Sequence, residues 1–297
     1  MIDLRSDTLT LPTPPMLQTI ESARFGDSGR WNAERRGEDP TMNELEDLAA
    51  EMMGKEAAAF CNSGTMGNLT ALLTCCRPGD TVLIDERQHL YRTEKGAFSP
   101  RLGQLQAVTY KADENGNPDV ADIARQLENK SVKLVCVENS HNNRGGQCMP
   151  LAVMKEIYQL AQGRGVHVHL DGARIFNAAL TLGVTARKIA QHSDSVMFCV
   201  SKGLGAPVGS LVCGTKDFIY QLRETRRLLG GDMRQSGVLA APALYALKHN
   251  IARLAEDNDH AAQLVRELKN LSVIQLPAHV QTNIVMLTVP FGSFLSR

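Results

Sequence analysis

Between residues 43 and 215 the chain alternates short apolar segments with amphipathic ones, and this alternation strongly constrains the fold. Segments 81–85 (TVLID), 133–139 (KLVCVEN) and 195–201 (SVMFCVS) are typical of buried strands. Segment 42–54 (MNELEDLAAEMMG) carries apolar residues at helical spacing and stops at a glycine. Because continuously apolar strands are separated by helices, the sequence predicts an α/β fold with a mostly parallel sheet covered on both faces.

Polar and small residues follow four of the expected strands. CNSGTMGN (61–68) leads from a strand into a helix, and ENSHNN (138–143) follows a second strand. DGAR (171–174) and SKGLGAPVGS (201–210) follow a third and a fourth. Ligands of such sheets bind at the carboxyl ends of the strands, so we expect the four clusters to meet at one edge.

Composition argues against several classes of function. The 297 residues are 43% hydrophobic and 22% charged, with a formal net charge of zero, so nucleic acid and anionic membranes are not expected partners. No apolar stretch is long enough to cross a bilayer. The seven cysteines lack CxxC spacing, which favours buried reduced thiols over a disulfide framework or a metal site. With no signal-like N-terminal segment, these features predict a cytoplasmic protein.

Three of the polar positions together match the needs of one cofactor. Lys202 and Asp171 each end a strand, and Ser63–Thr65 open a helix where backbone N–H groups can bind an anion. Alone, Ser63 is explained by an ordinary helix N-cap and Asp171 by a cap of the following helix. Pyridoxal phosphate requires an amine for a Schiff base, an anion for its ring nitrogen and a cradle for its phosphate. Together these residues predict a pyridoxal phosphate site.

Two histidines fall at the same expected edge. His89 follows the strand TVLID, and His141 follows KLVCVEN. A lone histidine is more often structural, but a neutral imidazole here could stack on the cofactor ring or accept a proton from a substrate hydroxyl. The sequence does not divide these two roles between them.

The motifs that contain these residues resemble those of the low-specificity L-threonine aldolases. The matching segments run in the same order from Ile2 to about Met286: DLRSDTLTLP, GEDPTMNELE, NSGTMGNL, VENSHN, HLDGARIFNAA, SKGLGAPVGSLV and MRQSG. The resemblance implies a fold-type-I, aspartate-aminotransferase-like enzyme that uses pyridoxal 5′-phosphate. It also implies a homo-oligomer, a dimer or tetramer, whose active sites draw on both subunits.

The resemblance further implies roles for the cofactor-binding residues. Lys202 would bond covalently to the cofactor, and Asp171 would hold its ring nitrogen. Gly64 and Thr65, beside Ser63, would contact the phosphate. Arg234 would assist there, from the same or a neighbouring subunit.

The remaining implied roles concern the substrate. His89 would lie over the cofactor ring, and His141 would face the substrate hydroxyl. Ser6 and Arg174 would lie near the substrate carboxylate or the ring oxygen. The implied reaction is cleavage of L-threonine or L-allo-threonine to glycine and acetaldehyde, a step of threonine catabolism and glycine biosynthesis, with either histidine as the base.

The chain departs from the family pattern in three places. The loop near residues 28–36 is longer and has Arg36 where the family has tyrosine, and Asp232 replaces a common glycine. The segment after residue 286 differs from the family, whose longer C-terminal domain carries a carboxylate-binding arginine; Arg297 is the sole arginine in this tail. We therefore expect a large cofactor-binding domain with an N-terminal arm over 1–250 and a partial small domain over 251–297. The main alternative to a working lyase is a catalytically impaired homologue that lacks this arginine. A third interpretation, another fold-type-I activity such as decarboxylation or transamination, is weaker because the motifs match the aldolases closely.

Overall fold

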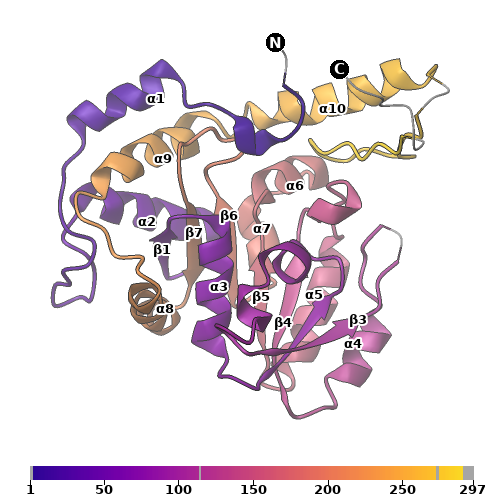
Figure 1. Cartoon of the computed structure of the whole chain (residues 1–297), viewed down its shortest axis with the longest axis horizontal. Coiled ribbons are helices and arrows are strands. Elements are labelled where there is room, and N and C mark those ends of the chain that lie inside the picture. Colours follow the sequence, from indigo (N-terminus) through magenta and orange to yellow (C-terminus); the bar gives the residue numbers. More distant parts are fainter. Residues whose placement is uncertain (1–2, 114, 272–273, 290–297) are drawn as a thin grey trace.

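The computed structural model describes residues 3–113, 115–271 and 274–289. Its centre is a seven-stranded sheet with the order β1-β7-β6-β5-β4-β2-β3 (Figure 1). The strands are β1 (Ala57–Cys61), β2 (Thr81–Asp85), β3 (Gln106–Tyr110), β4 (Val132–Glu138), β5 (His167–Asp171), β6 (Ser195–Cys199) and β7 (Ser210–Gly214). Strands β3, β2, β4, β5 and β6 pair in parallel, whereas β7 pairs antiparallel with both β6 and β1. The predicted mostly parallel sheet is confirmed.

Helices cover both faces of the sheet (Figure 1). The helices are α1 (Pro14–Gln18), α2 (Pro40–Met53), α3 (Gly64–Cys75), α4 (Val120–Gln126), α5 (Leu151–Gln162), α6 (Ile175–Leu182), α7 (Ala186–Ala190), α8 (Lys216–Leu228), α9 (Gly237–His249) and α10 (Leu254–Leu268). Helices α3 and α8 pack on one face, while α2 and α5 pack on the other. Five single turns complete the set: η1 (Asp7–Leu9), η2 (Thr19–Ser22), η3 (Leu90–Glu94), η4 (Gly96–Phe98) and η5 (Asn142–Arg144).

The apolar core is divided unequally between the two faces. On the side of α2 and α5, one continuous cluster runs across the strands and includes Phe60, Val168 and Phe198. On the side of α3 there are two smaller clusters, one at β2 and β4 and one at β1, β6 and β7. Strand β5 lies between these two clusters and contributes to neither.

The polar, charged and glycine-rich sequence of residues 24–37 predicts an exposed loop, but in the structure this loop is anchored on the rest of the molecule. Trp31 packs edge-on against Tyr220 of α8 at 5.8 Å between ring centroids, and Arg227 stacks on Trp31 at 4.0 Å. Ser28 is buried and bonds through its backbone and side chain to Met233. Aromatic and cation–π contacts with α8, invisible to local sequence patterns, explain the difference.

The end of the described chain follows α10 and packs on the rest of the molecule (Figure 1). The apolar runs near 274 and 284, expected as strands of a small domain, make one isolated bridge, Gln275 to Thr288, within the described residues. Gln281 bonds to Cys148 and Thr181, so this segment covers the loop after β4. Arg297 lies outside the described residues. Among the described helices, none combines the length and hydropathy that a bilayer crossing needs.

Candidate active site

The predicted polar clusters meet at one edge of the sheet. Strands β2, β4, β5 and β6 are parallel and end there, and β1 runs in the same direction because it pairs antiparallel with β7. Each of these strands leads into one of the polar turns or helices. The convergence inferred from the sequence is therefore confirmed.

The thiol of Cys199, at the end of β6, lies at the centre of this edge. Burial raises the pKa of the thiol, and the positive charges of Lys202 and Arg174 lower it. The negative charges of Asp171 and Glu94 raise it in turn. Asp171 and Glu94 both accept from the amide of Asn68, which places these two carboxylates together at this edge.

The N-terminus of α3 closes against Cys199. Ser63 caps this helix, its hydroxyl accepting the backbone N–H of Met66 at 3.1 Å. A Cβ on Gly64 would lie 2.8 Å from the Cys199 sulfur, so only glycine allows this approach. The first backbone N–H groups, those of Gly64 and Thr65, lie at the positive end of the helix dipole. This end of α3 has the chemistry of an anion cradle.

Asp171 ends β5 as a buried carboxylate with two hydrogen-bond donors. Its Oδ2 accepts Nδ2–H of Asn68 at 2.9 Å, and its Oδ1 accepts the backbone N–H of Ala173 at 3.1 Å. Asn68 also donates to Glu94, at 3.2 Å and 3.3 Å to its two oxygens. Since each carboxylate oxygen has two lone pairs, Asp171 can still accept a further N–H.

Lys202 lies in the bend that connects β6 with β7. The backbone carbonyl of Lys202 accepts the N–H of Gly205, whose φ of +80° favours glycine in this turn. In the part of the chain that the structure describes, the ammonium group makes no hydrogen bond or ion pair, and the side chain is half-buried. Such an amine is available for covalent chemistry.

Arg174 and Asp7 form a buried ion pair beside Lys202. Arg174 donates from Nε and Nη2 to the two oxygens of Asp7, both at 2.7 Å, and from Nη1 to Asn142 at 2.9 Å. Asn283 also donates to Asp7, at 2.9 Å. Burial raises the pKa of Asp7, but Arg174, Asn283 and the charge of Lys202 together hold it below its ordinary value.

A groove of about 1090 Å³ opens at this ion pair. It is lined by the N-terminal segment, by α10 and by residues 283–287, and it includes Ser6 and Arg174. The Ser6 hydroxyl accepts hydrogen bonds from the backbone and side chain of Thr8, capping η1. Ser6 and Arg174, which were assigned to the substrate carboxylate or the ring oxygen, thus line one groove, whereas His141, assigned to the substrate hydroxyl, is not part of its lining.

His89 begins a single π-helical turn, Leu90–Glu94, that brings Glu94 back to its ring. The Nδ1 atom of His89 lies 3.0 Å from Oε1 of Glu94. This hydrogen bond raises the pKa of His89, burial lowers it, and the charges of Glu94, Asp171 and Glu138 raise it, with a net increase. Because a carboxylate only accepts hydrogen bonds, Nδ1 carries a proton and Nε2 is the basic atom of the neutral ring.

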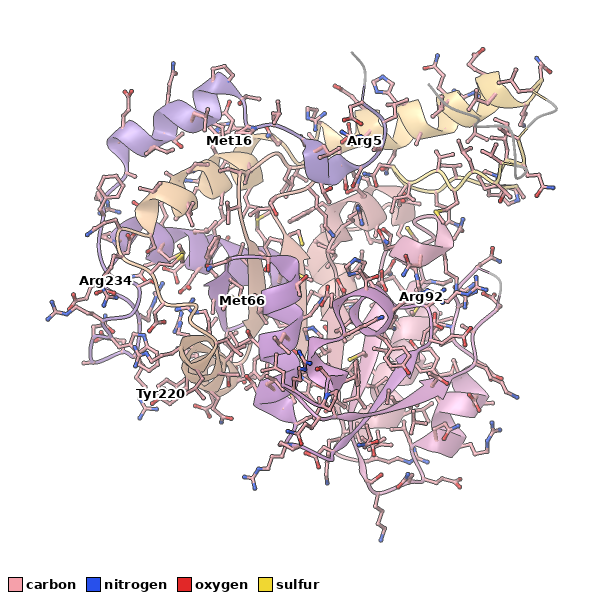
Figure 2. All side chains as sticks on the ribbon, in the orientation of Figure 1. Arg5, Met16, Met66, Arg92, Tyr220 and Arg234 are labelled. Carbon is pink, nitrogen blue, oxygen red and sulfur yellow. The ribbon has the colours of Figure 1, made fainter. Side chains whose placement is uncertain are left out.

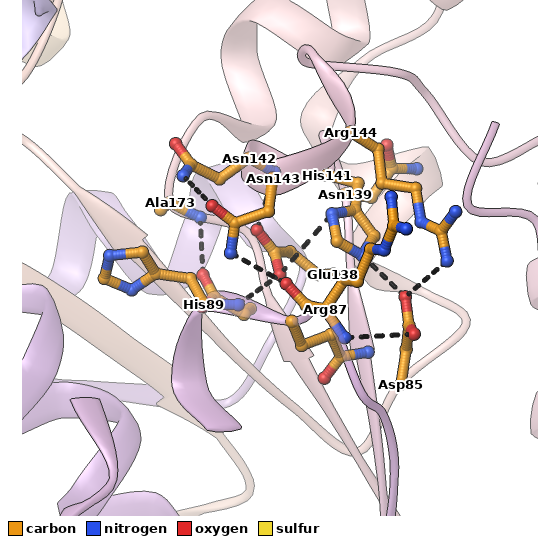
Figure 3. A network of polar contacts seen from close by, with 12 residues as sticks. Asp85, Arg87, His89, Glu138, Asn139, His141, Asn142, Asn143, Arg144 and Ala173 are labelled. Atoms are coloured by element: carbon orange, nitrogen blue, oxygen red, sulfur yellow. Dashed lines mark hydrogen bonds and ion pairs between the residues drawn. The ribbon is translucent and has the colours of Figure 1, made fainter. Parts of the chain in front are cut away.

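His141 is buried in a different set of contacts (Figure 3). Its Nε2 lies 2.8 Å from Oδ2 of Asp85, which Arg144 also approaches at 3.6 Å. Glu138 lies 3.9 Å from the Nδ1 atom and accepts the backbone N–H groups of His89 and Asn142. The His141 side chain is 4% exposed, whereas that of His89 is 32% exposed.

Arg234 lies away from the α3 N-terminus within one chain, whereas Asp232 follows Gly231, which packs on Met66 in the first turn of α3. Arg234 is exposed and pairs with Asp27 at 2.9 Å, at the outer margin of the molecule in the view of Figure 2. Its predicted role at the phosphate stays a prediction that depends on a second subunit. The added charge of Asp232 is neutralised by Arg227 at 2.6 Å and Arg226 at 3.5 Å.

Comparison with known proteins identifies the family. The sequence profile of the beta-eliminating lyases matches residues 3–290. The low-specificity L-threonine aldolase of Escherichia coli (strain K12) is 42% identical over 274 residues, which are 91% of this chain and 79% of that enzyme. The chain belongs to the beta-eliminating lyase family, and within it to the low-specificity L-threonine aldolases.

The other comparisons concern length and fold. An uncharacterised Caenorhabditis elegans protein is 43% identical over 274 residues, and the match covers 91% of this chain but 65% of that protein. The threonine aldolase of Leishmania major superposes with a TM-score of 0.80 at 21% identity, covering 96% of this chain and 83% of the other. The expected fold class is therefore confirmed, and the chain spans less than the full length of these family members.

Several residues of the site were not identified from the sequence. Asn68, Asp7 and His169 act through partners more than a hundred positions away, and Glu94 acts through His89, which lies five residues before it. One signal was present: the alternation in VHVHLD places His167, His169 and Asp171 on one face of a strand.

Proposed function

We propose that this chain cleaves L-threonine or L-allo-threonine to glycine and acetaldehyde with pyridoxal 5′-phosphate as cofactor. The observation that carries the proposal is the arrangement around Cys199, where an unpaired lysine, a buried carboxylate and a helix N-terminus meet. The identity with aldolases over most of the chain supports the same substrate class. As a working lyase it would serve threonine catabolism and glycine formation in the cytoplasm.

The residues present fit this cofactor. Lys202 offers an unpaired amine, and Asp171 retains lone pairs for a ring N–H. Gly64 and Thr65 offer backbone N–H groups to the phosphate, and glycine at position 64 keeps side-chain atoms out of the space beside Cys199. When bound, the cofactor supplies an electron-withdrawing ring that accepts the electrons of the broken carbon–carbon bond.

The protein would contribute binding and proton transfer. Asp171 holds a positive charge at the ring nitrogen, and Arg174 beside the groove offers a cation to the substrate carboxylate. That carboxylate must compete with Asp7, which accepts hydrogen bonds from the Nε and Nη2 atoms of Arg174. The competition is the specific feature that favours the impaired-homologue alternative.

His89 is better placed than His141 to take the proton of the substrate hydroxyl. The Nε2 atom of His89 is free of the Glu94 contact, and a third of the side chain is exposed. The Nε2 atom of His141 bonds to Asp85 in a buried pair. We assign His89 Nε2 as the base and His141 as a group that orders the loop after β4, next to the substrate.

The deciding experiment mixes the purified chain with pyridoxal phosphate and records the visible spectrum before and after borohydride reduction. Peptide mapping should place the reduced cofactor on Lys202, and Lys202→Ala should remove it. Acetaldehyde release from L-threonine is then assayed, beside carbon dioxide and keto-acid formation. Labelling of scattered surface lysines would reject the site, whereas labelling of Lys202 without acetaldehyde would establish the impaired homologue. Analytical ultracentrifugation would measure the oligomeric state, for which we expect a dimer or a tetramer.

A further inference from the structure

The face of β5 that packs on α3 carries a row of polar side chains through the protein interior. His167, His169 and Asp171 lie on this face, and Ser195 of β6 is the register partner of His169. Both His169 and Ser195 are fully buried. This row separates the two apolar clusters on the α3 side of the sheet. Since burying polar groups is costly unless they are hydrogen-bonded, such a row is stable only as a hydrogen-bonded network.

Every neighbouring pair in the row is hydrogen-bonded. From the strand start inward, His167 Nε2 lies 2.8 Å from Ser195 Oγ, which lies 2.9 Å from His169 Nδ1. The Nε2 atom of His169 then lies 3.1 Å from Oδ1 of Asn68. Asn68 completes the row by donating to Asp171 at 2.9 Å. The side chain of Asn68 uses both of its N–H groups and its oxygen.

The direction of every hydrogen bond follows from its carboxylate end. Asp171 and Glu94 only accept, so the amide nitrogen of Asn68 faces them and its oxygen faces His169. His169 must therefore carry its proton on Nε2, which leaves Nδ1 to accept from Ser195. The Ser195 oxygen in turn accepts from Nε2 of His167. All four donors point toward Asp171.

A neutral His169 is required for this arrangement, because a doubly protonated ring would present two donors to the row. Burial, with a smaller contribution from the neighbouring His167, lowers the pKa of His169 to about 3. His169 therefore stays neutral across the range in which proteins work. Aligned donors in a water-free interior polarise one another, so the bond on Asp171 is strengthened by those behind it.

We propose that His169 is a positioning residue of the cofactor site, which orients Asn68 so that its amide holds the Asp171 carboxylate toward the ring nitrogen of the cofactor. The inference rests on the proposed function, because it concerns the carboxylate that faces that ring. Ser195 and His167 set the tautomer of His169.

The test compares two probes whose rings differ at one atom: pyridoxal phosphate and an analogue with C–H in place of the ring nitrogen. In His169→Phe, the dissociation constant of pyridoxal phosphate should rise about tenfold, the effect of losing a hydrogen bond to a charged group. The dissociation constant of the analogue, which makes no bond to Asp171, should change less than about twofold. Equal weakening of both probes, or of neither, overturns the proposal.

Two further variants separate positioning from general stability. His169→Gln keeps an N–H donor near the Nε2 position and should restore the preference for pyridoxal phosphate over the analogue. Val168→Ala lies on the same strand but faces the continuous core, so it should lower stability and leave that preference unchanged. A loss of preference in Val168→Ala, or no rescue by glutamine, contradicts the assignment.

A measurement on the cofactor-free protein tests the direction of the row. Nitrogen NMR of labelled histidine should show His169 as the Nε2–H tautomer at neutral pH, and Ser195→Ala should mix in the other tautomer. An Nδ1–H tautomer in the unmodified chain overturns the inference. If pyridoxal phosphate fails to bind while the Nε2–H tautomer is found, the proposed function fails and the row stands as a structural network only, which also rejects the positioning role.

Discussion

The two faces of β5 differ in the chemistry of the side chains that they bury. Val168 and Leu170 enter a continuous apolar core, whereas His167, His169 and Asp171, one residue out of phase, enter a hydrogen-bonded row. The apolar face stabilises the sheet by burial alone. The polar face buries hydrogen-bonded side chains in place of apolar ones and ends at the Asp171 carboxylate. The comparison shows that one five-residue strand separates stability from chemistry by its side-chain period of two.

The largest expected effect is at the carboxyl end of the polar face. Asp171→Asn keeps the size of the side chain and removes its charge, so turnover of L-threonine should fall about 10³-fold. The protein should still fold, although the amide oxygen can keep only one of the two hydrogen bonds that Asp171 accepts, so the thermal transition should fall modestly. Steady-state kinetics on the cofactor-loaded enzyme measures the turnover, and calorimetry measures the thermal transition. Turnover within a few-fold of the unmodified chain would remove Asp171 from the mechanism.

The opposite face should respond in the reverse way. Leu170→Ala creates a cavity in the continuous core, where this side chain is fully buried, and should cost about 3 kcal/mol of unfolding free energy. Turnover per folded molecule should stay near that of the unmodified chain. Urea unfolding measures the free energy of unfolding, and steady-state kinetics at low temperature measures the turnover of the folded molecules. If the loss is mainly of turnover with stability unchanged, the division between the faces is wrong.

Low pH should reduce the free energy of unfolding because of His169, which lies on the polar face. The folded state keeps the ring neutral, with its pKa lowered to about 3 by burial, while the unfolded chain binds a proton near pH 6.5. As the pH falls below 6.5 the unfolded state therefore gains protons that the folded state does not, and stability decreases. Between pH 6.5 and 4.5 this should amount to about 2 kcal/mol, and His169→Gln should lack it. Parallel pH profiles for the two proteins would contradict this.

His89, at the rim of the same edge, should show the smallest effect and the opposite sign. Its pKa is raised above 6.5, chiefly by the hydrogen bond to Glu94, so its contribution is fully present below pH 6.5. That contribution is lost as the pH rises through the raised value. Unfolding free energies from pH 6 to 9 should decline less steeply in His89→Asn than in the unmodified chain. An unchanged slope would show that the Glu94 contact does not persist in solution.

Much of the fold was predictable because it depends on local composition. Strands β2, β4 and β6 appear as apolar runs, and the rule for parallel sheets places their carboxyl ends together. Lys202, Asp171 and Ser63–Thr65 could be chosen because each follows a strand and has the chemistry that a phosphorylated aldehyde cofactor needs. The loop near Trp31 was not predictable, since its anchor on Tyr220 joins residues nearly two hundred positions apart.

The linear order of residues was sufficient for the sheet, the family and the identity of the reactive groups, because apolar period and motif spacing are local properties of a chain. Which of these groups are hydrogen-bonded to one another depends on how the chain packs in three dimensions. Asn68 reaches Asp171 across 103 positions, and Asp7 reaches Arg174 across 167. The two candidate histidines are equivalent in the sequence but differ in the structure. His141 is buried with its Nε2 atom bonded to Asp85, whereas His89 is partly exposed and bonds to Glu94 through Nδ1, which leaves its Nε2 atom basic. Solvent exposure and charge at a side chain depend on what surrounds it in three dimensions, and neighbours in sequence supply only a small part of those surroundings.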